Sequence, residues 1–319
     1  MSKLLTIVGP TATGKTALAW QLAEHLWRTY QQPCDLISAD SRQVYQGLEI
    51  VSGLDLPRQA RQQDDYYVVD QHRLWGVNML KPTEEWSVAH FNHLVHRVTA
   101  LSWSEQRLPI IVGGTGLYSE LALISDPQLV IAPDLELRTQ VDELTLGELQ
   151  SWVQREAPDR WTALNDSDRA NPRRLVRVLE IARHPVTTPV VKTVKNAVRE
   201  LVVGVSLPIE EIEQRIAARV SERWQAGALA EISQLQSLAE ESPRLPALSS
   251  TGVKQVLAYL NDQATSDQAQ ASWVTAERQY AKRQITWWKK RAQVEWFAAD
   301  HSDWQEQVLS RIDTWYQAE

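Results

Sequence analysis

"GPTATGKT", residues 9–16, is the stretch that decides the fold. It fits the pattern G-x-x-x-x-G-K-T, in which glycines let backbone N–H groups turn toward an anion and the lysine adds a cation. The apolar run 3–9 predicts a strand before it, and the apolar periodicity of 16–27 predicts a helix after it. A strand, a glycine-rich loop and a helix N-terminus form a phosphate site. The expected phosphate-binding residues are Gly9, Pro10, Thr11, Ala12, Thr13, Gly14, Lys15 and Thr16, with the Thr16 hydroxyl as a ligand of Mg²⁺, the expected cofactor.

Three further apolar runs predict the rest of a sheet. The runs 34–41, 108–116 and 200–208 are nearly continuous, as is typical of parallel strands buried on both faces. Helical patterns separate them, so the fold class is α/β: a P-loop NTPase-like parallel sheet core with helices on both faces.

Residues 122–198 contain no strand-like run and predict a mostly helical insertion domain. The core is then formed by 1–121 and 199–319. Long helical patterns over 209–238 and 268–297 predict helices in its C-terminal part.

Composition limits the classes of protein that fit. No apolar run approaches the ~20 residues that cross a bilayer, and the apolar start of the chain leads directly into the phosphate loop, unlike a signal peptide. The single cysteine, Cys34, rules out an internal disulfide, and the seven histidines include no H-x-x-x-H pair, so we expect no metal ligands among them. We expect a cytoplasmic monomer without membrane contacts. The net charge of −7 argues weakly against a general nucleic-acid coat protein, although local charge matters more.

A nucleotide hydrolase normally has a second acidic residue at the end of a strand beside the phosphate loop. In this sequence one candidate strand lacks that acid and another has one. The run 108–116 ends in "VGGTG", without the carboxylate that normally holds Mg²⁺ in such enzymes. The strand-end acid that remains is Asp40, in "LISADSRQVY". Asp40 is a candidate for holding Mg²⁺ through water or for acting as a general base. The alternative is a turn cap, a function that Ser41 is also able to perform.

Two basic segments are candidate RNA contacts. "RQYAKRQITWWKKR" (278–291) has six Lys/Arg, no acid and interleaved aromatic residues, which suits a phosphate backbone; a solvated amphipathic helix with inward tryptophans is the alternative. The second, "DRANPRRLVRVLEIAR" (168–183), fits RNA contacts or a salt-bridged helix equally well.

Arg215, Arg219 and Arg223 are spaced four apart on one helical face. Arginines at this spacing either line a diphosphate site or pair with neighbouring glutamates. Ion pairing is favoured for Arg223.

Five segments occur in the order seen in one enzyme family: "GPTATGKT", "ISADSRQVYQGLEI" (37–50), "PIIVGGTGLY" (109–118), "RRLVRVLEI" (173–181) and "RQYAKRQITW" (278–287). Over residues 1 to about 290 the chain resembles bacterial tRNA dimethylallyltransferases (tRNA isopentenyltransferases). The resemblance implies transfer of the dimethylallyl group from dimethylallyl diphosphate to the exocyclic N6 amine of the adenine 3′ to the anticodon, with release of diphosphate. The implied partners are the anticodon stem-loop of tRNA and dimethylallyl diphosphate, and Mg²⁺ is required.

The same resemblance implies roles for single residues. Asp40 becomes the general base, Thr115 lies near the reacting centre, and Lys15 stabilises the leaving diphosphate together with Arg215 or Arg219. The target adenine has to leave the loop stack to reach them. The implied tRNA contacts are Asp40, Ser41, Arg42, Gln43, Arg138, Arg173, Arg174, Arg177, Lys282, Arg283, Gln284 and Trp287.

The chain departs from the family pattern in several places, and the segment 70–82 fits it only loosely. "EIVSGLDLP" (49–57) lacks the usual lysine, and "TGVKQ" (251–255) has Val253 for tyrosine and Gln255 for glutamate. Two other functions stay open on the residues alone. One is a small-molecule kinase, which leaves the basic segments unexplained, and the other is an RNA-binding protein without catalysis.

Overall fold

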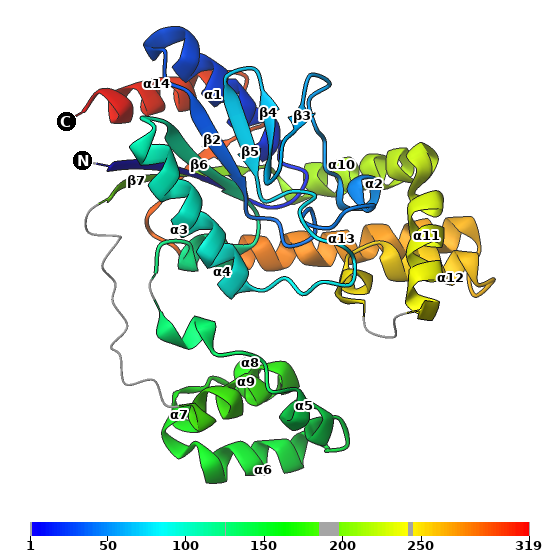
Figure 1. Ribbon diagram of the computed structural model, residues 1–319. Coiled ribbons are helices and arrows are strands. Elements are labelled where there is room, and N and C mark those ends of the chain that lie inside the picture. Colours follow the sequence, from blue (N-terminus) through cyan, green and yellow to red (C-terminus); the bar gives the residue numbers. More distant parts are fainter. Residues whose placement is uncertain (1, 125, 185–197, 242–244, 319) are drawn as a thin grey trace. The chain divides into compact units, whose positions relative to one another are not determined.

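The computed structural model describes residues 2–124, 126–184, 198–241 and 245–318 (Figure 1). The chain forms two compact units. The core unit comprises Met1–Leu123 and Val194–Glu319, and the insertion unit comprises Ile124–Thr193. The insertion expected at 122–198 includes residues 125 and 185–197, which lie outside the described residues.

An eight-stranded sheet forms the centre of the core unit, in the order β3-β4-β5-β2-β6-β1-β7-β8. Pairing is parallel from β5 to β8 and antiparallel at β3-β4 and β4-β5. The predicted α/β class is confirmed. The strands are β1 (Ser2–Val8), β2 (Cys34–Ser38), β3 (Arg61–Gln62), β4 (Tyr66–Val69), β5 (His72–Trp75), β6 (Leu108–Gly113), β7 (Val198–Ser206) and β8 (Val294–Ala298).

Helices cover both faces of the sheet, as predicted (Figure 1). On one face, α1 (Lys15–Tyr30) and α14 (Trp304–Gln317) pack on alternate strand residues such as Ile7. On the other, α3 (Val88–Ser104) and α4 (Gly116–Leu121) pack on the intervening residues such as Leu4. Because successive strand residues point to opposite faces, one apolar strand supplies both layers of core.

A further apolar cluster, separate from the two layers on the sheet, holds the C-terminal helices together. It includes Val44 and Leu48, which follow β2, and buried Trp273 of α13. Buried residues of α10, the segment 224–228, α11 and α12 complete this cluster. The helices are α2 (Glu49–Ser52), α10 (Ile209–Arg223), α11 (Leu229–Glu241), α12 (Val253–Leu260) and α13 (Ser266–Trp288).

Two helical expectations need correction. The pattern over 209–238 is divided by a π-helical segment at 224–228, in which Gly227 has φ +122°, a value that favours glycine. The helix expected over 268–297 ends at Trp288, and residues 294–298 form β8. Strand β8 pairs with β7, and its Trp296 packs against Gly204, where a Cβ atom would meet the indole at 2.6 Å. This pairing partner lies far away in the sequence, so local periodicity gives no sign of it.

The insertion unit has a small core of its own. Its helices are α5 (Leu135–Asp142), α6 (Leu146–Glu156), α7 (Pro158–Ala163), α8 (Asp166–Arg169) and α9 (Pro172–Arg183). Leucines and valines of α5, α6 and α9, among them Leu149 and Leu179, form the buried cluster.

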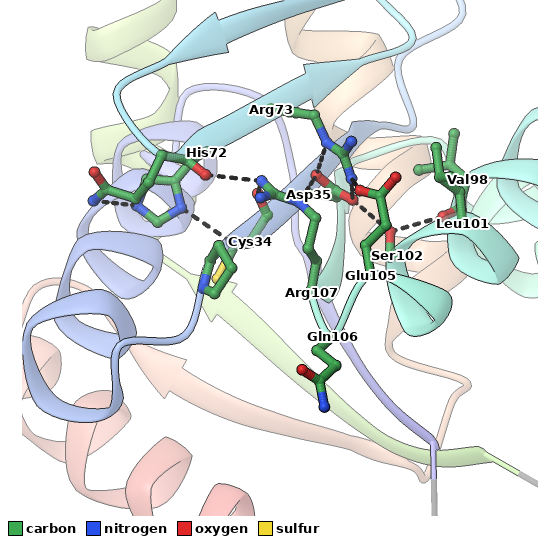
Figure 2. A network of polar contacts seen from close by, with 12 residues as sticks. Cys34, Asp35, His72, Arg73, Val98, Leu101, Ser102, Glu105, Gln106 and Arg107 are labelled. Atoms are coloured by element: carbon green, nitrogen blue, oxygen red, sulfur yellow. Dashed lines mark hydrogen bonds and ion pairs between the residues drawn. The ribbon is translucent and has the colours of Figure 1, made fainter.

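A buried polar network fixes the end of β2 that lies opposite Asp40 (Figure 2). Asp35 is fully buried and accepts hydrogen bonds from Arg73 of β5 (2.7 Å), from Arg107 (2.8 Å) and from Ser102 of α3 (2.6 Å). Burial alone would raise the pKa of Asp35, but the bonds from Arg73 and Ser102 and the charge of Arg107 outweigh burial and lower it. Since three elements meet at this carboxylate, it ties β5 and α3 to the centre of the sheet.

In the described part of the chain, no helix is both long and apolar enough to cross a bilayer.

Candidate active site

The phosphate loop connects β1 to α1 in the predicted geometry. Gly9 has φ +147°, and a Cβ atom there would lie 2.4 Å from the carbonyl oxygen of Val205, so only glycine fits. Gly14, at φ +87°, precedes the first residue of α1. The Thr13 hydroxyl donates to the Pro10 carbonyl (2.9 Å), and so does Lys15 Nζ (2.6 Å). The loop is therefore held by its own side chains, at the N-terminus of a helix where an anion is stabilised.

Lys15 is a partly buried amine close to another positive charge. Burial and the charge of Arg219 lower its pKa, the charge of Asp40 raises it, and the net result is a pKa of about 7. An anion bound in the loop would favour the charged form of this lysine.

Asp40 follows β2, two residues after Ser38. Its Oδ1 accepts the backbone N–H of Arg42 (2.9 Å), and its own N–H donates to the Ser38 hydroxyl (3.3 Å). The turn is thus capped by Asp40 itself and not by Ser41. The bond from the Arg42 N–H to Oδ1 fixes the direction of the carboxylate, which lines a cavity of the core unit.

One cavity of about 500 Å³ in the core unit brings the predicted residues together. The phosphate loop, the turn after β2, the end of β6 and one face of α10 and α13 form its wall. The sequence-predicted residues in the wall are Thr11, Ala12, Gly14, Lys15, Thr16, Asp40, Ser41, Arg42, Gln43, Thr115, Arg219, Arg283 and Gln284. The other candidates in the core unit, which do not line it, are Gly9, Pro10, Thr13, Arg215, Lys282 and Trp287.

Sequence reasoning missed Tyr280 as a site residue. Its hydroxyl lies 3.3 Å from Thr115 Oγ1, inside the cavity wall. Burial raises the pKa of Tyr280 to about 12, and the negative charge of Asp40 contributes to this shift. A signal was available in the sequence: Glu277, Tyr280 and Gln284 are three and four apart, so they share one face of α13.

Two arginines of α10 share one carboxylate at the cavity. Arg219 Nη2 donates to Thr11 Oγ1 (2.5 Å) and lies 3.5 Å from a Glu277 oxygen. Arg223 is buried, lies 3.6 Å from the other Glu277 oxygen and donates to the Val51 carbonyl (3.1 Å). Arg215, which was expected at the diphosphate, is half-exposed and lies 3.6 Å from a Glu211 oxygen.

The predicted RNA contacts on α13 have different surroundings. Gln284 is buried, and its Oε1 accepts the N–H of Thr11 (2.8 Å), so its side chain supports the phosphate loop. Trp287 packs so closely on Gly116 that a Cβ atom there would meet the indole at 2.1 Å. Lys282 is exposed and lies 3.6 Å from a Glu213 oxygen. Arg283 is exposed beside the Tyr280 ring and lines the cavity.

In the insertion unit, three of the four predicted arginines are engaged within the unit. Arg138 and Arg177 both pair with the buried carboxylate of Glu180, at 2.9 and 3.0 Å. Arg174 pairs with Asp168. Arg173 is exposed, and its guanidinium has no partner among the described residues. It is therefore the arginine of this set most available to a ligand.

Comparisons with known proteins show the family to which this chain belongs. A family model described as IPP transferase matches residues 43–291. A tRNA dimethylallyltransferase of Streptomyces griseus is 35% identical, with 94% of this chain and 92% of the relative covered, and one of Acaryochloris marina is 32% identical, with 94% of each covered.

Among solved structures, the tRNA isopentenylpyrophosphate transferase of Bacillus halodurans is 26% identical, with a TM-score of 0.69 over 99% of this chain and 97% of that one. A eukaryotic dimethylallyltransferase solved acting on tRNA shares the fold, with a TM-score of 0.74 at 21% identity, over 98% of this chain and 77% of that one. The resemblance noted in the sequence is confirmed.

Proposed function

This chain belongs to the IPP transferase family, and we infer that it is a tRNA dimethylallyltransferase. It transfers the dimethylallyl group of dimethylallyl diphosphate to the N6 amine of the adenine 3′ to the anticodon, and it releases diphosphate. Because the enzyme acts on tRNA, we assign it to the cytoplasm. The observation that carries the assignment of roles is the shared cavity, in which a phosphate loop and a strand-end carboxylate face the same space.

The phosphate loop is proposed to hold the diphosphate of the donor. Backbone N–H groups at the start of α1 point toward the loop, and Lys15 and Arg219 add positive charge beside it. Negative charge grows on the diphosphate as the allylic carbon–oxygen bond breaks. Fixed donors and cations in a buried site stabilise that charge more in the transition state than in the bound donor.

Asp40 is proposed as the general base. The adenine amine is a poor nucleophile because its lone pair is delocalised into the ring. As the bond from N6 to the allylic carbon forms, the diphosphate leaves with the electron pair of the broken bond, and an N6 proton passes to the Asp40 carboxylate. Thr115, on the same wall, is suited to hydrogen-bond the incoming amine or the diphosphate.

The cavity also fits a Mg²⁺ ion. Mg²⁺ is usually bound by one or two protein oxygens together with substrate phosphates and water. The cavity offers the Thr16 hydroxyl at the loop and the Asp40 carboxylate through water, and among the described residues no cluster of three metal-ligating side chains competes for the ion. When bound, the ion neutralises charge on the departing diphosphate.

The tRNA is proposed to reach the cavity with its target adenine extruded from the anticodon loop. Ser41, Arg42 and Gln43 follow Asp40 in the wall, and Arg283 lies on the opposite helix with its side chain exposed. In the insertion unit, Arg173 is available for the phosphate backbone. Contacts of this kind position the loop, while contacts with unstacked bases give specificity.

A donor competition separates this function from the kinase alternative. Purified protein with Mg²⁺ is given labelled dimethylallyl diphosphate and tRNA, and in parallel γ-labelled ATP with the same tRNA or small hydroxyl acceptors. We expect label in tRNA from the first donor only. Phosphoryl transfer from ATP without prenyl transfer would contradict the proposal. Binding of tRNA without any turnover would instead indicate an RNA-binding protein without catalysis.

A further inference from the structure

We propose that Arg223 is a second arginine ligand of the diphosphate, beside Arg219. This inference rests on the proposed function, because it assigns a residue to the anion site of that reaction. The sequence pattern favours ion pairing for Arg223, and the structure gives it a long ion pair with Glu277. It also places Arg223 in the cavity wall.

Arg223 is a buried cation without a close carboxylate. Its side chain is 9% exposed, and the guanidinium lines the cavity that Lys15 and Thr16 also line. Among the residues that the structure describes, its ion pair is with Glu277 at 3.6 Å, beyond hydrogen-bond distance, and it donates a hydrogen bond to the neutral Val51 carbonyl. A buried charge is costly unless it is paired and hydrogen-bonded, so this guanidinium retains capacity for an anion.

The balance of charge in the cavity wall points the same way. Five cationic side chains line it, Lys15, Arg42, Arg219, Arg223 and Arg283, against three carboxylates, Asp40, Asp55 and Glu277. With Lys15 in the charged form that a bound anion favours, the wall has an excess of two positive charges, in a protein whose net charge is −7. Glu277 is shared by Arg219 and Arg223, two of the three arginines of α10. A diphosphate supplies the missing negative charge, and its paired oxygens match the fork of a guanidinium.

Gly53 makes the space in which this guanidinium lies. The residue has φ +67°, and a Cβ atom there would lie 1.7 Å from Arg223 Nη2 and 2.6 Å from its Cζ. The guanidinium therefore rests directly on the backbone of the segment 49–57, which is the segment that lacks the usual lysine of the family. Arg223 brings a cation to that segment from α10 instead.

Helix geometry explains why Arg223 joins Arg219 and Arg215 does not. A spacing of four residues advances about 40° around an α-helix, so three arginines at this spacing spread over about 80°. The last two face the cavity and Glu277, and Arg215 turns toward Glu211 in solvent.

The test measures binding of inorganic diphosphate, with Mg²⁺ present, to the full chain by isothermal titration calorimetry. Arg223→Met keeps most of the side-chain volume and removes the charge. We expect it to weaken diphosphate binding about 10- to 100-fold, as for the loss of a charged hydrogen bond, while tRNA affinity stays within about twofold. Arg28→Met is the matched control, because Arg28 is exposed in the last turn of α1, at the end opposite the phosphate loop, and its loss removes the same charge.

A second variant, at Gly53, keeps Arg223 but displaces its guanidinium. Gly53→Ala puts a methyl group where the guanidinium lies, so it should also weaken diphosphate binding while Arg28→Met binds as wild type does. A folded Arg223→Met protein that binds diphosphate within twofold of wild type would overturn the inference. If Arg223→Met does not fold, unchanged diphosphate binding by Gly53→Ala overturns it equally.

Kinetics separate this inference from the function on which it rests. We expect Arg223→Met to raise the KM for dimethylallyl diphosphate and leave the KM for tRNA unchanged. A purely structural residue would lower thermal stability without this selective change. If wild type transfers the prenyl group and Arg223→Met shows neither effect, the inference fails and the proposed function stands. If wild type neither binds diphosphate nor modifies tRNA, the proposed function fails first.

Discussion

Asp40→Asn separates the proposed base from the turn in which it sits. In the structure one carboxylate oxygen accepts the N–H of Arg42 at 2.9 Å, and the carboxamide of asparagine keeps an oxygen able to accept the same bond. The substitution therefore preserves the shape of the turn and removes only the charge and the basic oxygen. Asp40→Ala would remove the turn bond as well, at a cost of about 1 kcal/mol in folding stability.

The expected loss of rate follows from the role. General-base catalysis contributes about 10²- to 10⁴-fold, which corresponds to about 3–5 kcal/mol of the activation barrier. Donor affinity should change little, because two effects of the substitution oppose each other. Loss of Asp40 removes a negative charge from the cavity, but that charge also raises the pKa of Lys15, so less of the lysine is then charged. The substitution should therefore lower kcat and leave the KM for the donor largely unchanged.

The assay is single-turnover transfer at saturating dimethylallyl diphosphate, with tRNA affinity measured separately by filter binding. Asp55→Asn is the matched control, since it removes another carboxylate from the same wall at an exposed position, and its rate should stay within a few-fold of wild type. The reasoning is refuted if Asp40→Asn retains more than a tenth of the wild-type rate, or if the two variants lose rate equally.

Three further outcomes are expected. Tyr280→Phe removes the hydroxyl 3.3 Å from Thr115 and should lower kcat about 2- to 10-fold in steady-state assays, with little change in donor KM; an unchanged kcat would mean that this contact orients nothing. Arg283→Ala should weaken tRNA binding and reduce the slope of log K against log salt by about 0.7–0.9, whereas an unchanged slope would place the phosphate contact elsewhere. Burial lowers the pKa of His72 to about 4, and its Nδ1 accepts the Cys34 N–H. In the unfolded chain the same imidazole binds a proton at its usual, higher pKa. The unfolded state therefore binds more protons than the folded state as pH falls, and folding stability is lost. Urea unfolding should therefore show a loss of about 2 kcal/mol between pH 7 and pH 5 that His72→Asn abolishes; equal losses in both proteins would contradict the assignment.

The parts of the fold that the sequence predicted correctly are those set by local patterns. The phosphate loop needs glycines at fixed positions, and the four predicted strands are continuous apolar runs buried on both faces. The strands that were missed are short, and some consist partly of polar residues, such as Arg61 and Gln62 in β3 and His72 and Arg73 in β5. Their assignment depends on pairing with distant partners, which one sequence does not reveal.

In the candidate site, too, the position of residues in short motifs could be predicted from the sequence, and that of residues placed by the tertiary fold could not. Asp40, Thr115 and the loop residues stand in short motifs, and the structure brings Asp40, Thr115 and most of the loop into the wall of one cavity. Which arginines of α10 face that cavity depends on the angular drift along the helix and on where Glu277 lies in the fold. Neither can be seen in the spacing alone, so Arg215 was expected at the diphosphate and Arg223 was not.

The most direct test of the central claim is mass spectrometry of tRNA nucleosides after incubation of the wild-type protein with unmodified tRNA, dimethylallyl diphosphate and Mg²⁺. The account predicts an adenosine that has gained one dimethylallyl group on N6, located by nuclease mapping to the position 3′ to the anticodon, and its absence with Asp40→Asn. Unmodified adenosine with the wild-type protein, or a product formed equally by the Asp40→Asn variant, would contradict it.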